Sequence, residues 1–424
     1  MVRFLYKIIS WITETFPNKG ARFIDSALFF IVGNILLHKI ILAWNVHLLK
    51  KVKKFEKICV IADVNIGDAV MNQSFISALR DYFPESCIDY VIKRSALHLV
   101  RNNKEISHVW PIYTTAPFPS EHDIREVNTL INESDFDVIF NFSPFLSSHK
   151  IKIPRRISVV GFFGIVPTLL QAQKNKKDKS HMMLSGYRFI HELFSRLKKP
   201  AKKTEFLGVS LILSQDTLDS AKKILIDKNS NHGTSIVFLN TDTSSRFTQI
   251  PFDIQKELLK KIINLTCDVL LGGGPSHKDF AIHLIDTIPL EKRNKIRIVP
   301  ITTPLDVFAV LIDYCDVFIT GDTGSLHMAA ARKYAQDGNF QFRNKTTVFS
   351  IFGATPPRVY GYDSQMSGFF VANQDAVSRV YIGNSHCRNL TYINKNDIMC
   401  NEQCFFNDIN VDKIIDDIQM FIKN

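Results

Sequence analysis

Residues 318–331, FITGDTGSLHMAAA, hold the densest group of side chains whose types and spacing can support chemistry. Apolar residues lead into a glycine turn and then into an alanine-rich stretch, which predicts a buried strand, a tight turn and a helix. Amides in the first turn of a helix lack intrahelical partners, and together with the helix macrodipole they favour anions. The segment is therefore predicted to be the phosphate-binding turn of a nucleotide-sugar site. Its candidate donor-binding residues are Asp322, Thr323, Gly324, Ser325, Leu326 and His327.

Two other polar turns follow predicted strands. Thr241, Ser244 and Arg246 belong to the hydroxyl-rich loop after strand 235–240. Asn65, Gly67 and Asp68 belong to the turn after strand 57–62. Ligands of parallel sheets bind outside the carboxyl ends of the strands, which places Asp68 at the mouth of a cleft. The alternative, a helix N-cap aspartate, is common and compatible with that position.

Strands alternate with helices in two successive runs, which predicts two doubly wound parallel sheets covered by helices on both faces. The first run has expected strands 57–62, 87–92, 109–112, 136–142 and 157–162, and helices 69–82, 96–101 and 181–197. The second run has expected strands 235–240, 267–271, 296–300, 317–320 and 346–352, and helices 276–285 and 304–313. The expected domains are a basic helical extension (1–55), a first α/β domain (56–200), a second α/β domain (205–380) and a cysteine-bearing tail with a helix (381–424).

Size and charge are those of a globular chain of 424 residues with a formal net charge of +11. A basic balance suggests nucleic acid, an anionic membrane surface or phosphorylated ligands. Nucleic acid is disfavoured, because the basic residues gather in the extension and no nucleic-acid-binding motif is present. Cys59, Cys267 and Cys315 lie in or beside apolar, strand-like runs, so buried free thiols and a reducing, cytoplasmic setting are expected.

The extension (1–55) has apolar stretches that are interrupted too soon for a membrane span, and no small-residue cleavage site follows them. Lysines gather around residues 50–57. Such helices either lie on an anionic membrane surface or pack on the body of the protein or at an oligomer interface, and the sequence does not choose between these readings.

Cys387, Cys400 and Cys404 lie in the tail with the spacing C-x12-C-x3-C, and His386 adjoins them. This spacing differs from the paired C-x2-C of zinc sites. Free thiols or a local clip are therefore favoured over a metal, and no metal site is predicted.

Three segments together resemble the ADP-heptose:lipopolysaccharide heptosyltransferases of glycosyltransferase family 9. They are residues 66–71 (IGDAVM), 304–331 ending in TGDTGSLHMAAA, and 352–357 (FGATPP). The cysteine-bearing tail is similar too, and the resemblance covers most of residues 56–424. It implies a GT-B fold, in which two doubly wound Rossmann-like domains face a cleft. It also implies a nucleotide-linked heptose donor and inversion at the anomeric carbon without a metal or other cofactor.

The resemblance also assigns roles. An inverting transfer needs a base for the acceptor hydroxyl, and Asp68 fits that role. The helix start after Gly321 stabilises the leaving diphosphate, while Asp322 and His327 bind the donor and Asp279 contacts the ribose. In the alternative interpretation Asp322 and His327 only cap the helix and Asp279 is surface charge.

One departure concerns residues 248–251 (TQIP), where the family usually has a lysine three positions before a Trp-Pro pair. Arg246 lies two residues earlier and is expected to supply the positive charge. We expect an enzyme that moves heptose from ADP-heptose to a lipopolysaccharide or lipooligosaccharide core, in the cytoplasm or on the inner face of the inner membrane. The alternatives are another nucleotide sugar, a protein acceptor, or donor binding without turnover.

Overall fold

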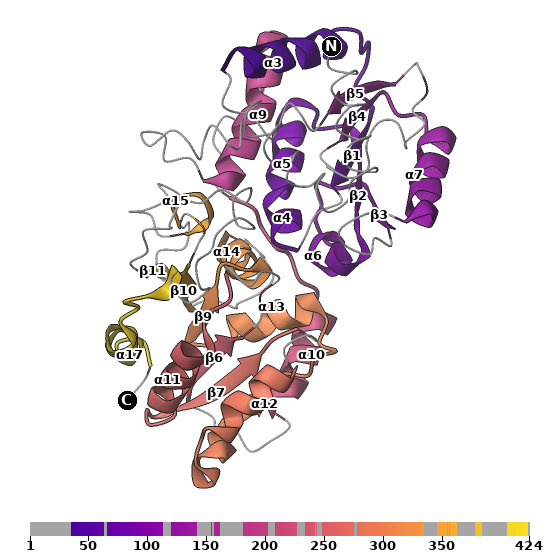
Figure 1. Cartoon of the computed structure of the whole chain (residues 1–424). Coiled ribbons are helices and arrows are strands. Elements are labelled where there is room, and N and C mark those ends of the chain that lie inside the picture. The colour runs from indigo at the N-terminus through magenta and orange to yellow at the C-terminus, as the bar shows by residue number, and fades with distance from the viewer. Residues whose placement is uncertain are drawn as a thin grey trace. The chain divides into compact units, whose positions relative to one another are not determined.

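The computed structural model divides the chain into two compact units, Met1–Val209 and Ser210–Asn424, each described by itself (Figure 1). The described residues are 35–62, 66–112, 120–141, 154, 157–161, 181–201, 208–226, 234–241, 243, 248–274, 278–334, 346–353, 355, 357–362, 378–383 and 405–422. Separate domains at 1–55 and 381–424 stay a prediction.

The first unit is built on a five-stranded sheet with the order β3-β2-β1-β4-β5. All neighbouring strands are parallel. The strands are β1 (Lys57–Ala62), β2 (Cys87–Lys93), β3 (His108–Ile112), β4 (Val138–Asn141) and β5 (Ser158–Gly161). Each predicted strand of this run is confirmed, with ends that shift by one or two residues.

Helices cover both faces of this sheet (Figure 1). On one face lie α3 (Ile35–Leu49), α4 (Ile66–Met71), α5 (Gln73–Tyr82) and α9 (Met182–Arg196). On the other face α7 (Glu121–Glu133) packs its Val127, Leu130 and Ile131 on alternate strand residues such as Cys59, Val91 and Ile112. The short η1 (Arg94–Ala96) and α6 (Leu97–Val100) follow β2.

Two differences from the predicted helices matter. The expected helix 69–82 is two helices, and the first begins at Ile66, so Asp68 lies in its first turn rather than before it. Helix α7 was not predicted, although Ser120 and Asp123 form a capping box at its start. That signal, a serine followed three residues later by an acidic residue, was present in the sequence.

The second unit has a six-stranded parallel sheet with the order β11-β10-β9-β6-β7-β8. The strands are β6 (Ser235–Asn240), β7 (Cys267–Gly272), β8 (Ile296–Ile298), β9 (Val317–Gly321), β10 (Thr347–Phe352) and β11 (Ser378–Ile382). The five predicted strands of this run are confirmed, and β11 is additional.

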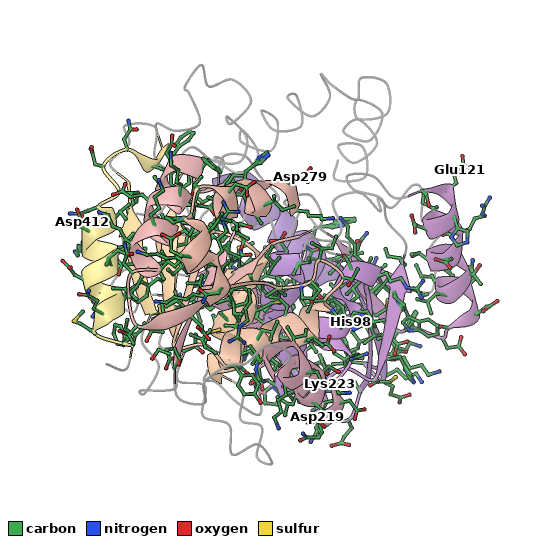
Figure 2. All side chains as sticks on the ribbon, turned by 90° about the horizontal axis from the view of Figure 1, so that it is seen from below. His98, Glu121, Asp219, Lys223, Asp279 and Asp412 are labelled. Atoms are coloured by element: carbon green, nitrogen blue, oxygen red, sulfur yellow. The ribbon has the colours of Figure 1, made fainter. Side chains whose placement is uncertain are left out.

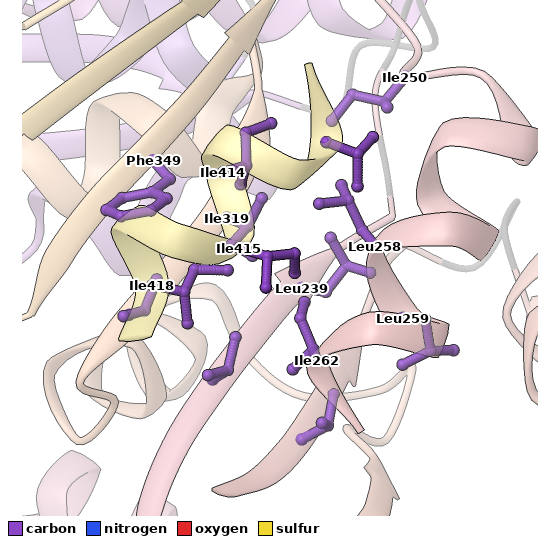
Figure 3. Close-up of a cluster of buried hydrophobic side chains, with 14 of the residues drawn as sticks. Leu239, Ile250, Leu258, Leu259, Ile262, Ile319, Phe349, Ile414, Ile415 and Ile418 are labelled. Atoms are coloured by element: carbon purple, nitrogen blue, oxygen red, sulfur yellow. The ribbon is translucent and has the colours of Figure 1, made fainter. Parts of the chain in front are cut away.

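Side chains of alternate strand residues point to opposite faces of this sheet. One face carries α11 (Phe252–Ile262), α12 (Lys278–Asp286) and α17 (Val411–Gln419), and the other α10 (Gln215–Ile226), α13 (Leu305–Asp313) and α14 (Gly324–Tyr334). Figure 3 shows Ile414, Ile415 and Ile418 of α17 among side chains from α11 and the sheet. The short η4 (Leu290–Lys295) precedes β8, and α15 (Pro357–Tyr360) follows β10.

Both sheets reverse their strand order once, β1 lying beside β4 in the first unit and β6 beside β9 in the second. Ligands of doubly wound sheets bind at the carboxyl ends of the strands at such a switch point. In each unit this edge is where a predicted polar turn follows a strand. Buried free thiols are confirmed at Cys59, Cys267 and Cys315.

Candidate functional site

A cluster of buried hydroxyls joins β6, β9 and α14 at the switch point of the second unit. The Asn240 amide donates to Thr320 Oγ1 at 3.0 Å and to Ser325 Oγ at 2.8 Å. Thr323 Oγ1 lies 2.6 Å from Ser325 Oγ and 3.2 Å from Thr320 Oγ1. Because each group has several partners, the cluster holds the start of α14 in one conformation. The free amides of that helix start are thus positioned for an anion.

The turn itself lies tightly against the rest of the second unit. A Cβ atom on Gly321 would stand 2.9 Å from the backbone oxygen of Thr248, so only glycine fits without a shift. Asp322, Thr323 and Gly324 are partly exposed, whereas the Leu326 side chain is fully buried. The Leu326 side chain is therefore out of reach of a ligand, and its amide donates to the Thr323 carbonyl at 3.1 Å.

His327 is buried against Tyr362. Its Nδ1 lies 2.8 Å from the Tyr362 hydroxyl, and the two rings meet edge to face. Burial lowers the pKa of His327 from 6.5 to about 3, so the imidazole is neutral at physiological pH. Its Nε2 lies 3.9 Å from Asp322 Oδ1, which would be an ion pair only with a charged ring. The contact is therefore polar rather than ionic, and His327 brings no positive charge to the turn.

Thr241, at the end of β6, is buried and bonded to the backbone of β7. Its amide and its hydroxyl both donate to the Gly272 carbonyl, at 2.7 and 3.0 Å. The Thr241 carbonyl accepts from the Gln249 side chain at 3.0 Å. Gln249 belongs to the segment where the family usually has a lysine. In this chain its side-chain amide instead donates to the backbone of the loop.

Asp279 is exposed in the first turn of α12, which follows β7, the neighbour of β6 in the sheet (Figure 2). It thus belongs to the same sheet edge as the hydroxyl cluster, one strand further out. Its exposure leaves the carboxylate accessible to two vicinal hydroxyls of a ligand.

The first unit contributes Gly67 and Asp68, both partly exposed, in the first turn of α4. This turn follows β1, which lies at the switch point. The phenol of Tyr90 is fully buried, and this burial is the main reason that its pKa is raised. The negative charge of Asp68 raises the pKa of Tyr90 further. Asn65, Ser244 and Arg246 lie outside the described residues.

Sequence reasoning missed Asn240 and Tyr362 as parts of the site. Asn240 ends an otherwise apolar strand, and a polar residue at that point was a usable signal, since buried amides need partners. Tyr362 is 35 residues beyond His327 in the chain, and no local pattern connects the two.

Among the described residues, two groups have the composition of a metal site, Cys87 with Asp89 and His108, and His122 with Asp123 and Glu126. Neither includes a predicted site residue. The cysteines of the tail lie outside the described residues. Within the described ranges, every helix is too short or too polar to cross a membrane.

Two successive doubly wound parallel sheets are the architecture of the GT-B fold class. The chain belongs to glycosyltransferase family 9 (heptosyltransferase), whose family model matches residues 127–389. The resemblance inferred from the sequence, the fold class and the assignment as a glycosyltransferase are thereby confirmed.

Two solved structures share the fold. A family 9 glycosyltransferase from Veillonella parvula has a TM-score of 0.63 at 15% identity, covering 87% of this chain and 97% of that one. The ADP-heptose lipopolysaccharide heptosyltransferase II of E. coli has a TM-score of 0.60 at 17% identity, covering 86% and 98%. The chain is also 22% identical over 282 residues to lipopolysaccharide heptosyltransferase 2 of Salmonella typhimurium, covering 65% of this chain and 80% of the relative.

Proposed function

We propose that this protein transfers heptose from ADP-heptose to a lipopolysaccharide or lipooligosaccharide core acceptor, with inversion and without a metal ion. The observation that supports this most is the hydroxyl-braced start of α14 at the switch point of the second sheet. Such a helix start favours an anion such as a diphosphate, because its amides and the macrodipole act on the same charge. Membership of family 9, the heptosyltransferases, supports heptose as the transferred sugar.

The proposed base is Asp68 of the first unit. Its first-turn position in α4 leaves it partly exposed at the carboxyl edge of the sheet, where an acceptor hydroxyl can approach. In an inverting transfer the base takes the proton of that hydroxyl while the oxygen attacks the anomeric carbon from the side opposite the diphosphate. Asn65 and Gly67, in the same turn, are proposed to border the acceptor.

The donor side is proposed to combine three kinds of contact. Amides and hydroxyls of the α14 turn hold the diphosphate, Asp322 and neutral His327 accept or donate hydrogen bonds to the sugar, and Asp279 binds the ribose. Residues 248–251 bring no cation, so Arg246, with Ser244 in the same loop, is proposed to offset the charge of the leaving diphosphate.

The test is incubation of the full chain with ADP-heptose and a truncated lipopolysaccharide core, read as the mass of the acceptor. A gain of one heptose is expected. Asp68→Asn is expected to lower kcat about 10²–10⁴-fold, as for loss of a general base, with donor affinity retained. Arg246→Ala should lower kcat, and Arg246→Lys should recover part of it.

The same assay separates the alternatives. Transfer from a different nucleotide sugar would replace the proposed donor. Transfer only to a protein would replace the proposed acceptor. In both cases the protein would still be a glycosyltransferase. Donor binding without transfer to any acceptor would mean that the departure at residues 248–251 has cost turnover. Full activity of Asp68→Asn would refute the base assignment.

We also propose a cytoplasmic location with peripheral attachment to an anionic membrane surface. In the described part of the extension, Trp44 is 41% exposed on α3, and exposed lysines follow at 50, 51 and 53. An exposed aromatic residue followed by exposed lysines suits such a surface. Sedimentation with vesicles of phosphatidylglycerol should pull down the chain at low salt, and replacing the three lysines with glutamine should release it. Binding that ignores salt and these lysines would refute the proposal.

A further inference from the structure

A cysteine, an aspartate and a histidine meet on one face of the first sheet, away from the proposed transfer site. Cys87 and Asp89 are two residues apart on β2, so their side chains share a face. His108 on β3 is the register partner of Asp89 and lies on the same face. This face is the one that α7 covers, since Val91 and Ile112 of the same strands pack there.

The three potential ligand atoms lie close to one another. Cys87 Sγ is 3.4 Å from Asp89 Oδ1 and 3.6 Å from His108 Nδ1, and His108 Nδ1 is 3.0 Å from Asp89 Oδ1. Tetrahedral zinc with ordinary bond lengths separates sulfur from nitrogen by about 3.6 Å, sulfur from oxygen by about 3.5 Å and nitrogen from oxygen by about 3.3 Å. The observed triangle matches these edges to within a few tenths of an ångström.

The carboxylate of this group is firmly held. Asp89 is only 5% exposed, so its carboxylate is held in place, and its other oxygen, Oδ2, accepts from Trp110 Nε1 at 2.8 Å. An outer hydrogen bond of this kind orients the carboxylate of many metal sites. His108 is largely exposed, which gives an ion a path from solvent and leaves room for water at the fourth position.

We propose that Cys87, Asp89 and His108 bind a divalent cation of the zinc class. Binding releases the Cys87 thiol proton to solvent, so the thiolate and the Asp89 carboxylate together balance the charge of the ion. His108 coordinates through Nδ1 in the neutral form that carries its proton on Nε2. Sulfur, nitrogen and oxygen ligands in one site suit zinc rather than magnesium or calcium, which prefer oxygen alone.

The site lies at the amino ends of β2 and β3, whereas transfer is proposed at the carboxyl edge. Along β2, Asp89 lies about 13 Å and Cys87 about 20 Å from the carboxyl end of the strand. The cation therefore takes no part in sugar transfer. It fastens β3, the edge strand of the sheet, to β2.

The test uses the full chain with Zn²⁺ in competition with a chromophoric chelator, and Co²⁺ as a spectroscopic probe. One equivalent of Zn²⁺ is expected at this site, with a thiolate-to-cobalt charge-transfer band and the visible bands of tetrahedral Co²⁺. Cys87→Ser should abolish the charge-transfer band. His108→Gln, at an exposed position that does not endanger folding, should weaken Zn²⁺ binding at least tenfold. Trp110→Phe should weaken it about 10–100-fold, because the carboxylate loses its orienting bond.

Two controls separate this site from other metal-binding groups. The triple variant Cys387→Ser, Cys400→Ser and Cys404→Ser should still bind one equivalent of Zn²⁺ and should still show the thiolate-to-cobalt band. His122→Gln, in the other group, which lies on α7, should do the same. The proposal is overturned if Cys87→Ser and His108→Gln bind Zn²⁺ as the unchanged chain does, or if the triple variant loses all tetrahedral cobalt signal. In either case the three groups form only a hydrogen-bonded cluster.

Discussion

Replacing His327 with glutamine is expected to make the second unit less sensitive to acid. The imidazole is 4% exposed, and burial lowers its pKa from 6.5 to about 3. Between these pH values the unfolded chain takes up a proton at this position and the folded chain does not. The stabilisation due to the neutral ring is therefore complete above pH 6.5 and is lost progressively as the pH falls toward 3.

The magnitude follows from the two pKa values. Each unit of difference corresponds to 1.36 kcal/mol, so the free energy of unfolding should fall by about 2.7 kcal/mol between pH 7.5 and 4.5 because of this group alone. Carboxylates elsewhere titrate in the same range, but they do so in the variant as well. The difference between the unchanged chain and His327→Gln isolates the histidine and should shrink by about 2.7 kcal/mol over this interval.

Oxidation of Met328 by hydrogen peroxide across a urea series is a suitable assay, read by mass spectrometry of its peptide. Met328 is buried beside His327 in α14, and its thioether does not titrate. Tryptophan fluorescence would report the other unit, because Trp11, Trp44 and Trp110 all belong to it.

Tyr362→Phe is the matched control. It keeps the buried imidazole and removes only the hydroxyl bonded to Nδ1. It should be less stable at every pH but keep the pH dependence of the unchanged chain, because burial and not the hydroxyl lowers the pKa. If the curves of the unchanged chain and of His327→Gln run parallel from pH 7.5 to 4.5, the folded imidazole titrates normally and the reasoning is refuted.

Gly321→Ala sets a Cβ 2.9 Å from the Thr248 oxygen and should cost about 1–3 kcal/mol in the same assay; an unchanged midpoint would mean that the loop yields freely. Arg332→Met removes the guanidinium that pairs with the buried Asp313 carboxylate at 2.7 Å and should cost about 3–5 kcal/mol. The double variant with Asp313→Leu should recover much of the lost free energy of unfolding. If the losses of the two single variants add instead, the predicted pairing is contradicted. Asp279→Asn should raise the KM for the donor with little change in kcat, and an equal fall in kcat would contradict a binding role.

The sequence pattern was sufficient to predict most strands, because most of them are buried on both faces of the sheet. Runs such as residues 57–62 and 235–240 are apolar almost throughout and end in polar turns, which is typical of parallel sheets. Helix ends were harder to predict. Asn72 separates α4 from α5 without any proline or glycine to mark the break. The additional strand β11 is partly exposed along its length, and its apolar run is only three residues long (380–382).

The site was predictable where its residues are contiguous and not where they meet through folding. Residues 318–331 carry a local signal, since strand, turn and helix start follow one another. The amide of Asn240 reaches Thr320 and Ser325 only because β6 and β9 are neighbours in the sheet. Composition also cannot show that burial leaves His327 neutral, because that depends on Tyr362 and the packing around it.

That neutrality bears on how a diphosphate can be held. From Thr320 to Met328 the sequence contains no lysine or arginine, and with His327 neutral the only formal charge is the negative one of Asp322. The start of α14 offers roughly half a positive charge, less than a diphosphate requires. The proposed diphosphate site therefore needs a cation from another segment, and we expect one at the same sheet edge. The loop after β6 is adjacent in strand order and contains Arg246, which is why the proposed turnover depends on that residue more than on His327.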